Sequence, residues 1–302
     1  MNLQYALWFL GSVVISLGLF ALMNRGKKGL FTQCLLMGLF GTVLGAVCAK
    51  LVFYLSLIDF MVMRGWLKSL VDVTMGTFSY YGGVAGFCLG VVLSARLTRQ
   101  KPMALLDSFA PAGLLLAALA RFGEYFLDGV GIRDMLYWEH PELCFFPLAV
   151  SNEYEEWLYA VFMLEGLLTL GVLALCLTRL KKRRFLRSLF YLCLIQILCE
   201  SLRTDSFTWL FVRVEQLFCM LGVAGVLLVY CIKTPGVPRR WLPIAYCLLA
   251  AGVFVVLEFA LNGKIPIPQN VCYAIMVAGL IALGLNESWA FRRMEKELSH
   301  KA

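Results

Sequence analysis

The stretch MALLDSFAPAGLLLAALARFGEYF, Met103–Phe126, starts as a mostly apolar run and ends in charged residues. About twenty such residues are enough to carry a helix across a bilayer. Arg121 and Glu124 stand three residues apart at its end, so a helix places both on one face. Charged groups cost free energy in a membrane, and this pair therefore indicates an internal ion pair or a functional site.

The rest of the chain is equally apolar. Of its 302 residues, 61% are hydrophobic and only 15% are charged, which is too apolar for a soluble protein of this size. The runs do not alternate apolar and polar residues, as strands of a membrane β-barrel would. We therefore predict an all-α, polytopic membrane bundle of about nine transmembrane helices. The runs cover residues 3–23, 30–55, 78–97, 103–123, 157–178, 187–203, 210–232, 241–261 and 270–285.

The basic residues predict the orientation of the chain. Nineteen of the 27 Lys and Arg residues follow the first, third, fifth, seventh or ninth run. Cytoplasmic loops carry the excess of Lys and Arg, so we expect the N-terminus outside and the C-terminus in the cytoplasm. The net charge of +8 then reflects topology, because the basic residues are spread over short loops, and it does not indicate nucleic-acid binding.

Residues that bind metals or form disulfides are few or dispersed. Ten of the eleven cysteines lie in predicted spans and only Cys144 in an outer loop, so they are expected to act as small apolar residues. The two histidines, His140 and His300, lie outside the spans, and no Cys-x-x-Cys pair occurs. We predict no metal site. A glycine-rich phosphate loop is also missing, which disfavours an ATP-driven machine.

Two regions outside the spans have their own character. Residues 56–77 mix apolar and charged residues and predict an interfacial helix on the outer face, with Trp66 at headgroup level. Residues 124–156 form the longest predicted loop, which holds eight acidic residues and one basic residue, Arg133. This loop is either a solvated connection or a lid over an outward-facing site.

Polar residues from five spans are expected at one level, just inside the outer leaflet. Arg121 lies about 27 Å along its helix, near the outer boundary. Arginines at this level suit a phosphate-bearing lipid, although a single one often only extends to the interface. Glu165 and Glu258 lie deeper, where each could be a paired structural carboxylate. The residues at the outer level are Tyr5, Tyr80, Tyr81, Gly82, Gly83, Arg121, Gln196, Glu200, Arg203, Arg213, Glu215 and Gln216.

Several of these segments together resemble the prolipoprotein diacylglyceryl transferase family. The segment TFSYYGGVAGFCLGVVLSARLTRQ, residues 77–100, falls where the family has a His-Gly-Gly motif. LLDSFAP, residues 105–111, matches an Asp-x-x-Ala-Pro motif, and Arg121 with Gly123 matches an Arg-x-Gly-Asn signature. GTVLGAVCAKLVFYL (41–55), CESLRTD (199–205), Gln216 and Tyr5 resemble further family features. The resemblance covers residues 1–232, so residues 233–302 are expected to be a C-terminal extension with two further transmembrane helices and a cytoplasmic tail.

The resemblance implies an enzyme of the bacterial plasma membrane that needs no cofactor. It would transfer the diacylglyceryl group of phosphatidylglycerol to the lipobox cysteine of a prolipoprotein at the outer face. Its partners would be that phospholipid and the signal peptide that carries the cysteine. The implied catalytic residues are Tyr81, Arg121, Glu200 and Arg203. The implied substrate-binding residues are Arg121, Tyr5, Gly82, Gly83, Glu124, Gln196 and Gln216.

Three polar positions depart from the family pattern. Tyr81 replaces the motif histidine, Glu124 replaces the signature asparagine, and Gln196 replaces a later arginine. A phenol, with an ordinary pKa near 10, is a poorer base at neutral pH than imidazole, with a pKa near 6.5. The chain is thus either a divergent transferase or a relative that binds lipid without the chemistry. A transporter or channel is disfavoured because the charged residues gather at one face and no internal repeat is evident.

Overall fold

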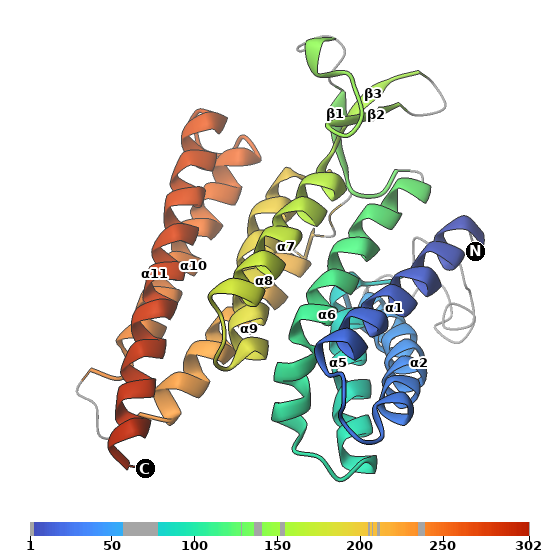
Figure 1. Ribbon diagram of the computed structural model, residues 1–302. Coiled ribbons are helices and arrows are strands. Elements are labelled where there is room, and N and C mark those ends of the chain that lie inside the picture. The colour runs from blue at the N-terminus through green and yellow to red at the C-terminus, as the bar shows by residue number, and fades with distance from the viewer. Residues whose placement is uncertain are drawn as a thin grey trace. The chain divides into compact units, whose positions relative to one another are not determined.

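A computed structural model describes residues 3–56, 78–127, 129–135, 141–151, 155–204, 206, 208–209, 212–234 and 239–301. The interfacial helix predicted over 56–77, apart from its first residue, lies outside this part of the chain. Nine helices in the described part are long and apolar enough to cross a membrane, which confirms the predicted helical membrane fold (Figure 1). They are α1 (Leu3–Met23), α2 (Leu30–Ser56), α5 (Tyr80–Leu97), α6 (Pro102–Gly123), α7 (Val161–Thr178), α8 (Arg184–Leu202), α9 (Val214–Ile232), α10 (Leu242–Leu261) and α11 (Gln269–Lys301).

The helices form two compact units. The first contains Met1–Ser188 and Arg203–Asp205, and the second contains Leu189–Leu202 and Ser206–Ala302. Helix α8 therefore contributes its first residues to one unit and the remainder to the other. Each unit is described by itself below.

Close packing of α2 against α5 organises the first unit, and glycines make it possible. A Cβ added at Gly90 would lie 2.6 Å from the Cα of Gly41, and one added at Gly86 would lie 2.6 Å from the carbonyl carbon of Leu44. No real Cβ makes contacts this short. Small residues let helix backbones approach in this way in membrane proteins, where the lipid gives helices no hydrophobic reason to associate.

An aromatic core joins these two helices to α1 and α6. The rings of Phe87 on α5 and Phe109 on α6 stack with centroids 5.5 Å apart, and Phe20 of α1 meets Phe109 at 6.0 Å. Phe20 and Met37 of α2 are almost completely buried beside them. Buried aromatic pairs of this kind gain more than their contact area alone provides.

The motif residue Asp107 holds the start of α8 within the first unit. Its Oδ1 accepts a hydrogen bond of 2.8 Å from the backbone N–H of Phe185, in the first turn of α8. The first N–H groups of a helix have no partner inside the helix, so a carboxylate from a neighbouring helix satisfies one of them. The described contact of Asp107 is therefore structural.

The predicted outer loop over 124–156 contains more structure than expected. A 3₁₀ turn, Glu124–Phe126, follows α6, and the strands β1 (Ile132–Met135), β2 (Ala149–Ser151) and β3 (Trp157–Ala160) form an antiparallel sheet in the order β1-β3-β2. Figure 1 shows this sheet beyond the end of α6. The predicted fifth span began at 157, but its first four residues pair in the sheet and the helix begins at Val161.

The second unit is built from most of α8 with α9, α10 and α11. A two-stranded hairpin, β4 (Thr208–Trp209) with β5 (Val212–Arg213), precedes α9. Helices α10 and α11 pack on each other and both contact α9. Buried Tyr230 of α9 donates a hydrogen bond of 3.2 Å to Glu287 of α11, which also accepts one of 3.2 Å from Tyr191 of α8. Helix α11 is thus tied to α8 and α9 by polar contacts.

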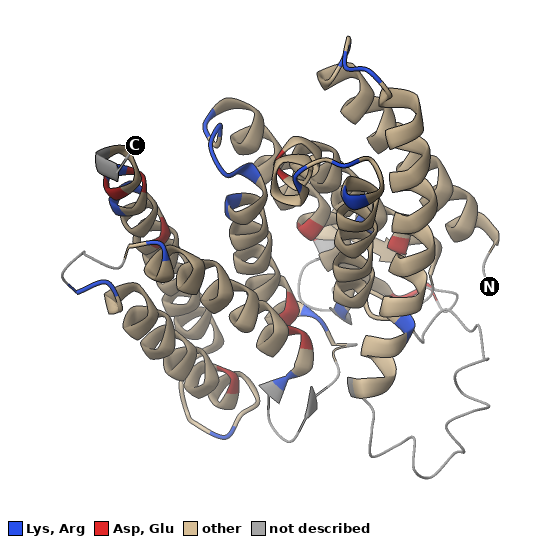
Figure 2. Ribbon diagram, turned by 90° about the horizontal axis from the view of Figure 1, so that it is seen from below, with Lys and Arg blue, Asp and Glu red and all other residues tan. Residues whose placement is uncertain are grey.

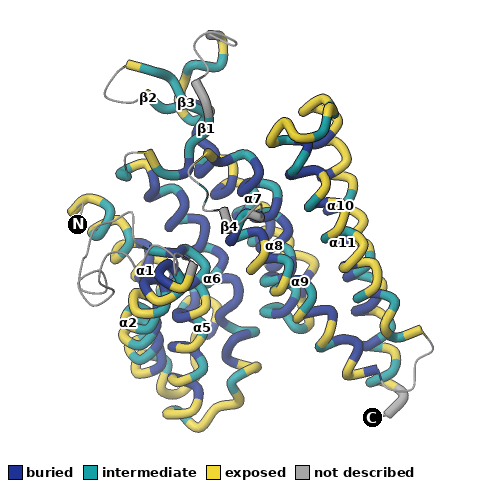
Figure 3. The backbone as a smooth tube through the Cα atoms, turned by 180° about the vertical axis from the view of Figure 1, so that it is seen from behind, coloured by how far each residue is buried: buried dark blue, intermediate teal, exposed yellow. Residues whose placement is uncertain are grey.

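Large apolar side chains are exposed on the outer surfaces of the helices. Figure 3 shows exposed segments along α1, α2, α10 and α11. Val14 of α1 is 69% exposed and Leu248 of α10 is 65% exposed. Charged residues gather instead mainly at helix ends and connections (Figure 2). A surface of this kind suits lipid rather than water. The predicted orientation of the termini stays a prediction.

Replacing Gly90 with alanine should disrupt the first unit. The new methyl group would collide with the backbone of α2, and overpacking of this kind costs about 1–3 kcal/mol. We expect a lower midpoint of thermal unfolding in detergent micelles. Gly18→Ala on α1 is the matched control, because nothing lies within 4 Å of its added Cβ. Equal midpoints for the two variants would refute the close approach of α2 and α5.

Candidate functional site

The guanidinium of Arg121 lies at the end of α6 and is almost completely buried, with 1% of the residue exposed. Its Nη1 forms an ion pair with Oε1 of Glu124, and its Nε forms one with Oε1 of Glu165 on α7. Its carbon Cζ lies 3.6 Å from the centre of the Tyr80 ring, a cation–π contact. Arg121 is therefore held from three sides by carboxylates and an aromatic face.

Arg203, which directly follows α8, joins the same cluster. Its Nη1 lies 3.4 Å from Oε2 of Glu124 and 3.6 Å from Oε2 of Glu165. All four side chains are at least nine-tenths buried. We call these four residues the arginine cluster: Arg121, Glu124, Glu165 and Arg203. With every member charged, its two cations balance its two anions, which is the arrangement that buried charges require.

Nη2 of Arg121 has no hydrogen-bond partner among the described residues. Oε2 of Glu124 accepts no hydrogen bond there either, and it keeps a long ion pair of 3.4 Å with Arg203. A buried polar atom without a partner costs free energy, so each such atom needs an explanation. Within the described part of the chain, the N–H groups of Nη2 are therefore left without an acceptor.

Local structure explains how the arginine cluster is assembled. At Gly123, an added Cβ would lie 2.5 Å from Cδ1 of Trp8, and the Trp8 indole donates a 2.6 Å hydrogen bond to the carbonyl of Leu119. This contact fixes α1 against the last turn of α6. Gly131 has a φ of +70°, and an added Cβ there would meet Oε2 of Glu124 and would lie 2.8 Å from Cβ of Phe162. Glycine at 123 thus makes room for Trp8, and glycine at 131 lets the chain pass close to Glu124 with a positive φ.

The tyrosines of the predicted site adjoin the arginine cluster in different ways. Tyr5, predicted to bind substrate, lies within electrostatic range of Arg121 and Glu124. The ring against Arg121 belongs to Tyr80, whereas Tyr81 meets Tyr80 edge-on with centroids 5.4 Å apart. Tyr80 also donates a hydrogen bond of 3.4 Å to the carbonyl of Ala117 on α6. The motif position predicts Tyr81 as the functional tyrosine, whereas the ring that lies on Arg121 is that of Tyr80, which the sequence places at the same level.

Gly82 and Gly83, both predicted to bind substrate, differ in the space around them. An added Cβ at Gly82 would lie 2.7 Å from the Cα of Ala49, so this glycine serves the packing of α5 on α2. At Gly83 an added Cβ would lie 3.8 Å from Cβ of Ala49, an ordinary contact. Ser79 caps the helix here, because its Oγ accepts a hydrogen bond from the N–H of Gly82. Gly83 alone of the pair has room for a side chain.

The remaining predicted residues, Gln196, Glu200 and Gln216, belong to the second unit. Gln196 and Glu200 are buried on α8, one turn apart. Neither amide atom of Gln196, nor Oε2 of Glu200, has a hydrogen-bond partner among the described residues. The side-chain amide of Gln216 on α9, in contrast, forms hydrogen bonds. Its Nε2 lies 2.6 Å from Oγ of Ser201 and 2.8 Å from Oε1 of Glu258.

Glu258 of α10 is the centre of this second polar group. Its Oε1 accepts a 2.6 Å hydrogen bond from Ser201, and its Oε2 lies 3.2 Å from Nε of Arg213. The Nη1 of Arg213 also donates a 2.7 Å bond to the carbonyl of Glu200. The Glu258 carboxylate of α10 thus accepts a hydrogen bond from Gln216, which was predicted to bind substrate.

Sequence reasoning recognised Glu165 and Glu258 only as possible paired carboxylates, and both have an arginine partner. The position of Glu165 within an apolar span could have identified it as a candidate site residue, because an acidic residue there needs a partner. Among the described residues, no three His, Cys, Asp or Glu side chains lie where they could share a metal ion.

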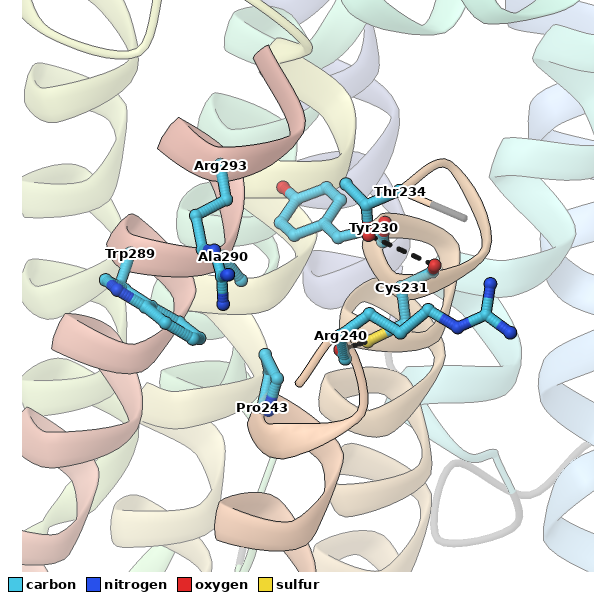
Figure 4. A pocket seen from close by; sticks show the side chains of 8 residues that line it. All are labelled: Tyr230, Cys231, Thr234, Arg240, Pro243, Trp289, Ala290 and Arg293. Atoms are coloured by element: carbon cyan, nitrogen blue, oxygen red, sulfur yellow. Dashed lines mark hydrogen bonds between the residues drawn. The ribbon is translucent and has the colours of Figure 1, made fainter. Parts of the chain in front are cut away.

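A small hollow lies elsewhere in the second unit, between α9, the start of α10 and α11 (Figure 4). Its volume of about 10 Å³ is barely enough for one water molecule, and a lipid headgroup needs far more. Arg293 reaches toward the hollow, whereas the guanidinium of Arg240 points away from it (Figure 4). The hollow is therefore a packing defect beside Trp289 rather than a ligand site.

Glu165→Ala should destabilise the first unit strongly. Removing one carboxylate leaves two buried arginines with a single anion, and breaking a buried pair costs about 3–5 kcal/mol. We expect a clearly lower unfolding midpoint in detergent, measured beside Glu155→Gln, which alters an exposed carboxylate. The double variant Glu165→Gln with Arg203→Met should regain part of the loss, because it restores charge balance. A Glu165→Ala protein as stable as the parent would contradict the ion pairs.

Comparison with known proteins identifies the family. The profile of the prolipoprotein diacylglyceryl transferase family matches residues 3–232, so α10 and α11 lie beyond the match. A phosphatidylglycerol–prolipoprotein diacylglyceryl transferase of Clostridium novyi (strain NT) is 25% identical over 194 residues, which are 61% of this chain and 73% of the relative. Proteins of the same name from Trichormus variabilis (26% over 217 residues; 64% and 73%) and Listeria innocua (23% over 235 residues; 72% and 80%) are also similar.

These findings confirm the predicted localisation as a multi-pass protein of the bacterial plasma membrane, which agrees with the nine apolar helices. They also confirm the resemblance drawn from the motifs. The chain belongs to the prolipoprotein diacylglyceryl transferase family.

Proposed function

We propose that the protein transfers the diacylglyceryl group of phosphatidylglycerol to the lipobox cysteine of a prolipoprotein at the outer face of the plasma membrane. Membership of a transferase family supports the class of reaction. The observation that carries the proposal is the buried guanidinium of Arg121, whose Nη2 has no hydrogen-bond partner among the described residues. A lipid phosphate oxygen is a natural acceptor for those N–H groups.

The reaction assigns a task to each part of such a site. The cysteine thiolate attacks the carbon of the diacylglyceryl group that bears the phosphate. The bond between this carbon and the phosphate oxygen breaks, so a thioether forms and glycerol phosphate leaves. Negative charge grows on the leaving phosphate oxygen, so a guanidinium fixed in a dry site lowers the barrier. The phosphate must displace a covering side chain to reach Nη2, because this atom is shielded from water in the present arrangement.

The other residues would position the Arg121 guanidinium and assist the proton transfer from the thiol. Tyr80 and Glu165 hold the plane of the Arg121 guanidinium, and Arg203 holds the carboxylates. The thiol must lose its proton before it attacks. Tyr81, in the position of the family histidine, would help this transfer or hydrogen-bond the headgroup. Tyr5 and Gly83 would line the lipid path. The family resemblance also implies roles for Glu200, Gln196 and Gln216, which belong to the second unit.

A second candidate is a relative that binds anionic lipid without turnover. The specific observation in its favour is charge balance, because Glu124 and Glu165 already offset both arginines of the cluster. Such a protein would purify with lipid but would release no glycerol phosphate from phosphatidylglycerol. The two candidates therefore differ in one measurable product.

Complementation tests the proposal. We expect the chain, expressed in bacteria depleted of their own transferase, to restore lipid-modified lipoprotein, as seen by mass spectrometry of the modified cysteine. Arg121→Ala should lower this product by about 100-fold or more, the usual effect of removing a main electrostatic contact from a transition state. Arg292→Ala, which removes an exposed arginine from α11, is the control and should stay active.

Protein amounts in the membrane must be equal for the comparison. An Arg121→Ala variant as active as the parent would remove the phosphate-binding assignment. Absence of product from the well-expressed parent, together with co-purified phospholipid, would favour the non-catalytic candidate.

A further inference from the structure

The turn that leads into β2 exposes three large apolar side chains within four residues. Phe145, Phe146 and Leu148 are 50%, 58% and 47% exposed, whereas Ala149, the first residue of β2, is fully buried. Single exposed apolar residues are common on protein surfaces, but a contiguous group of this kind usually marks an interaction surface. We call the segment Phe145–Leu148 the aromatic turn.

Backbone hydrogen bonds give the aromatic turn a definite shape. The N–H groups of Leu148 and Ala149 both donate to the carbonyl of Phe145, each at 3.0 Å. The carbonyl of Leu148 accepts a 2.9 Å bond from the N–H of Ala160, the last residue of β3. The exposed side chains therefore belong to a hydrogen-bonded turn that is fixed to the sheet.

Two contacts place the aromatic turn at the ends of membrane helices. Ala160, which bonds to Leu148, is followed directly by Val161, the first residue of α7. The ring of Phe146 meets the ring of Tyr125 edge-on, with centroids 5.8 Å apart, and Tyr125 lies two residues beyond the end of α6. Because α6 has 22 residues, it is about 33 Å long and can cross a hydrocarbon core about 30 Å thick. The aromatic turn therefore lies at the level of the lipid headgroups.

The aromatic turn is also continuous with a surface that faces lipid. Tyr125 contacts Phe126, and the centroid of the Phe126 ring lies 5.7 Å from that of Trp8 on α1. Trp8 and its neighbour Leu7 are both exposed on this apolar membrane helix. Aromatic side chains are enriched where a membrane protein passes from hydrocarbon to water, because their rings suit that boundary. This chain of aromatic contacts indicates lipid as the partner that covers the turn.

Electrostatic attraction does not explain a surface of this kind. The segment between α6 and α7, residues 124–156, contains eight acidic residues and one basic residue. Anionic headgroups attract basic segments, so they repel an acidic one. Attachment to a membrane therefore depends on insertion of the apolar side chains and is independent of a negative charge on the lipid.

We propose that the aromatic turn inserts into the headgroup region of the leaflet at this end of α6 and anchors the three-stranded sheet to the membrane surface. The predicted orientation makes this the outer leaflet. The anchor goes beyond the proposed function, because it requires neither a reaction nor the phosphate site at Arg121. Through Tyr125 it also holds the 3₁₀ turn whose first residue, Glu124, pairs with Arg121.

Photocrosslinking on the full chain tests the anchor. The photoreactive amino acid p-benzoylphenylalanine replaces Phe146, and the protein is reconstituted in nanodiscs of phosphatidylcholine. Illumination should give lipid adducts, counted by mass spectrometry, in amounts similar to those from the same amino acid at Val14, which is exposed on α1. Glu155 is the matched control, because it is exposed and precedes β3, up to about 16 Å from the Ala160 end of that strand. Adducts there should be at least about tenfold fewer.

A second measurement uses the unsubstituted protein. Phosphatidylcholine with a diazirine close to its glycerol backbone should label residues 143–150 of the parent in nanodiscs. The double variant Phe145→Ser with Phe146→Ser should lower this label by at least about fivefold, because it removes the apolar surface that inserts. Because the parent itself is labelled, the test does not depend on whether any variant folds.

Each outcome supports or overturns the anchor. Lipid adducts from Phe146 and Val14 but not from Glu155, together with label on the parent turn, would support it. Adducts from Val14 alone would overturn it, because the turn would then lie in water. Adducts from Phe146 that pass from lipid to a prolipoprotein added to the same nanodiscs would make the turn a polypeptide-binding surface and overturn it too. Adducts that form only with phosphatidylglycerol would contradict insertion that is independent of lipid charge.

Discussion

One constraint underlies the site, namely that a guanidinium at the end of a membrane helix is kept away from water. Arg121 meets this constraint with a carboxylate from its own turn, another from α7 and the face of Tyr80. Taking one partner away leaves an uncompensated charge in a medium of low dielectric, which is far more costly than losing an exposed ion pair. Nη2 has no acceptor among the described residues, and the proposed phosphate site is based on this atom.

The scaffold around this guanidinium is held by backbone contacts more than by side chains. Glycines on α5 bring it against the backbone of α2, Gly123 admits Trp8, and Asp107 satisfies the start of α8. Gly82, Gly123 and Asp107 lie in the segments that resemble the family motifs, and their described contacts are packing or backbone contacts. Packing of the scaffold and the ion pairs of the arginine cluster thus depend on different residues.

Most of the fold could be predicted from the sequence because hydrocarbon thickness sets helix length, and eight of the nine described helices agree with the apolar runs within a few residues. The exception is α11, predicted over 270–285, which continues as a helix to Lys301 through residues expected to form a tail. The site was only partly predictable. Spacing on one helix gave the Arg121–Glu124 pair, whereas the partnership with Glu165 depends on how α6 meets α7. Nor could any periodicity distinguish Tyr80 from Tyr81, or show that Glu258 of α10 accepts a hydrogen bond from Gln216. Strands near the outer loop were missed because each is at most four residues long.

The central claim is that Arg121 binds the phosphate of a membrane lipid. The most direct measurement is an experimental structure of the protein in nanodiscs that contain phosphatidylglycerol. The account predicts headgroup density with a phosphate oxygen within hydrogen-bond distance of Nη2 of Arg121, and a shift of the side chains that now cover this atom. Lipid density confined to the outer apolar surfaces, with the Arg121 guanidinium still enclosed by Glu124, Glu165 and Tyr80, would contradict it.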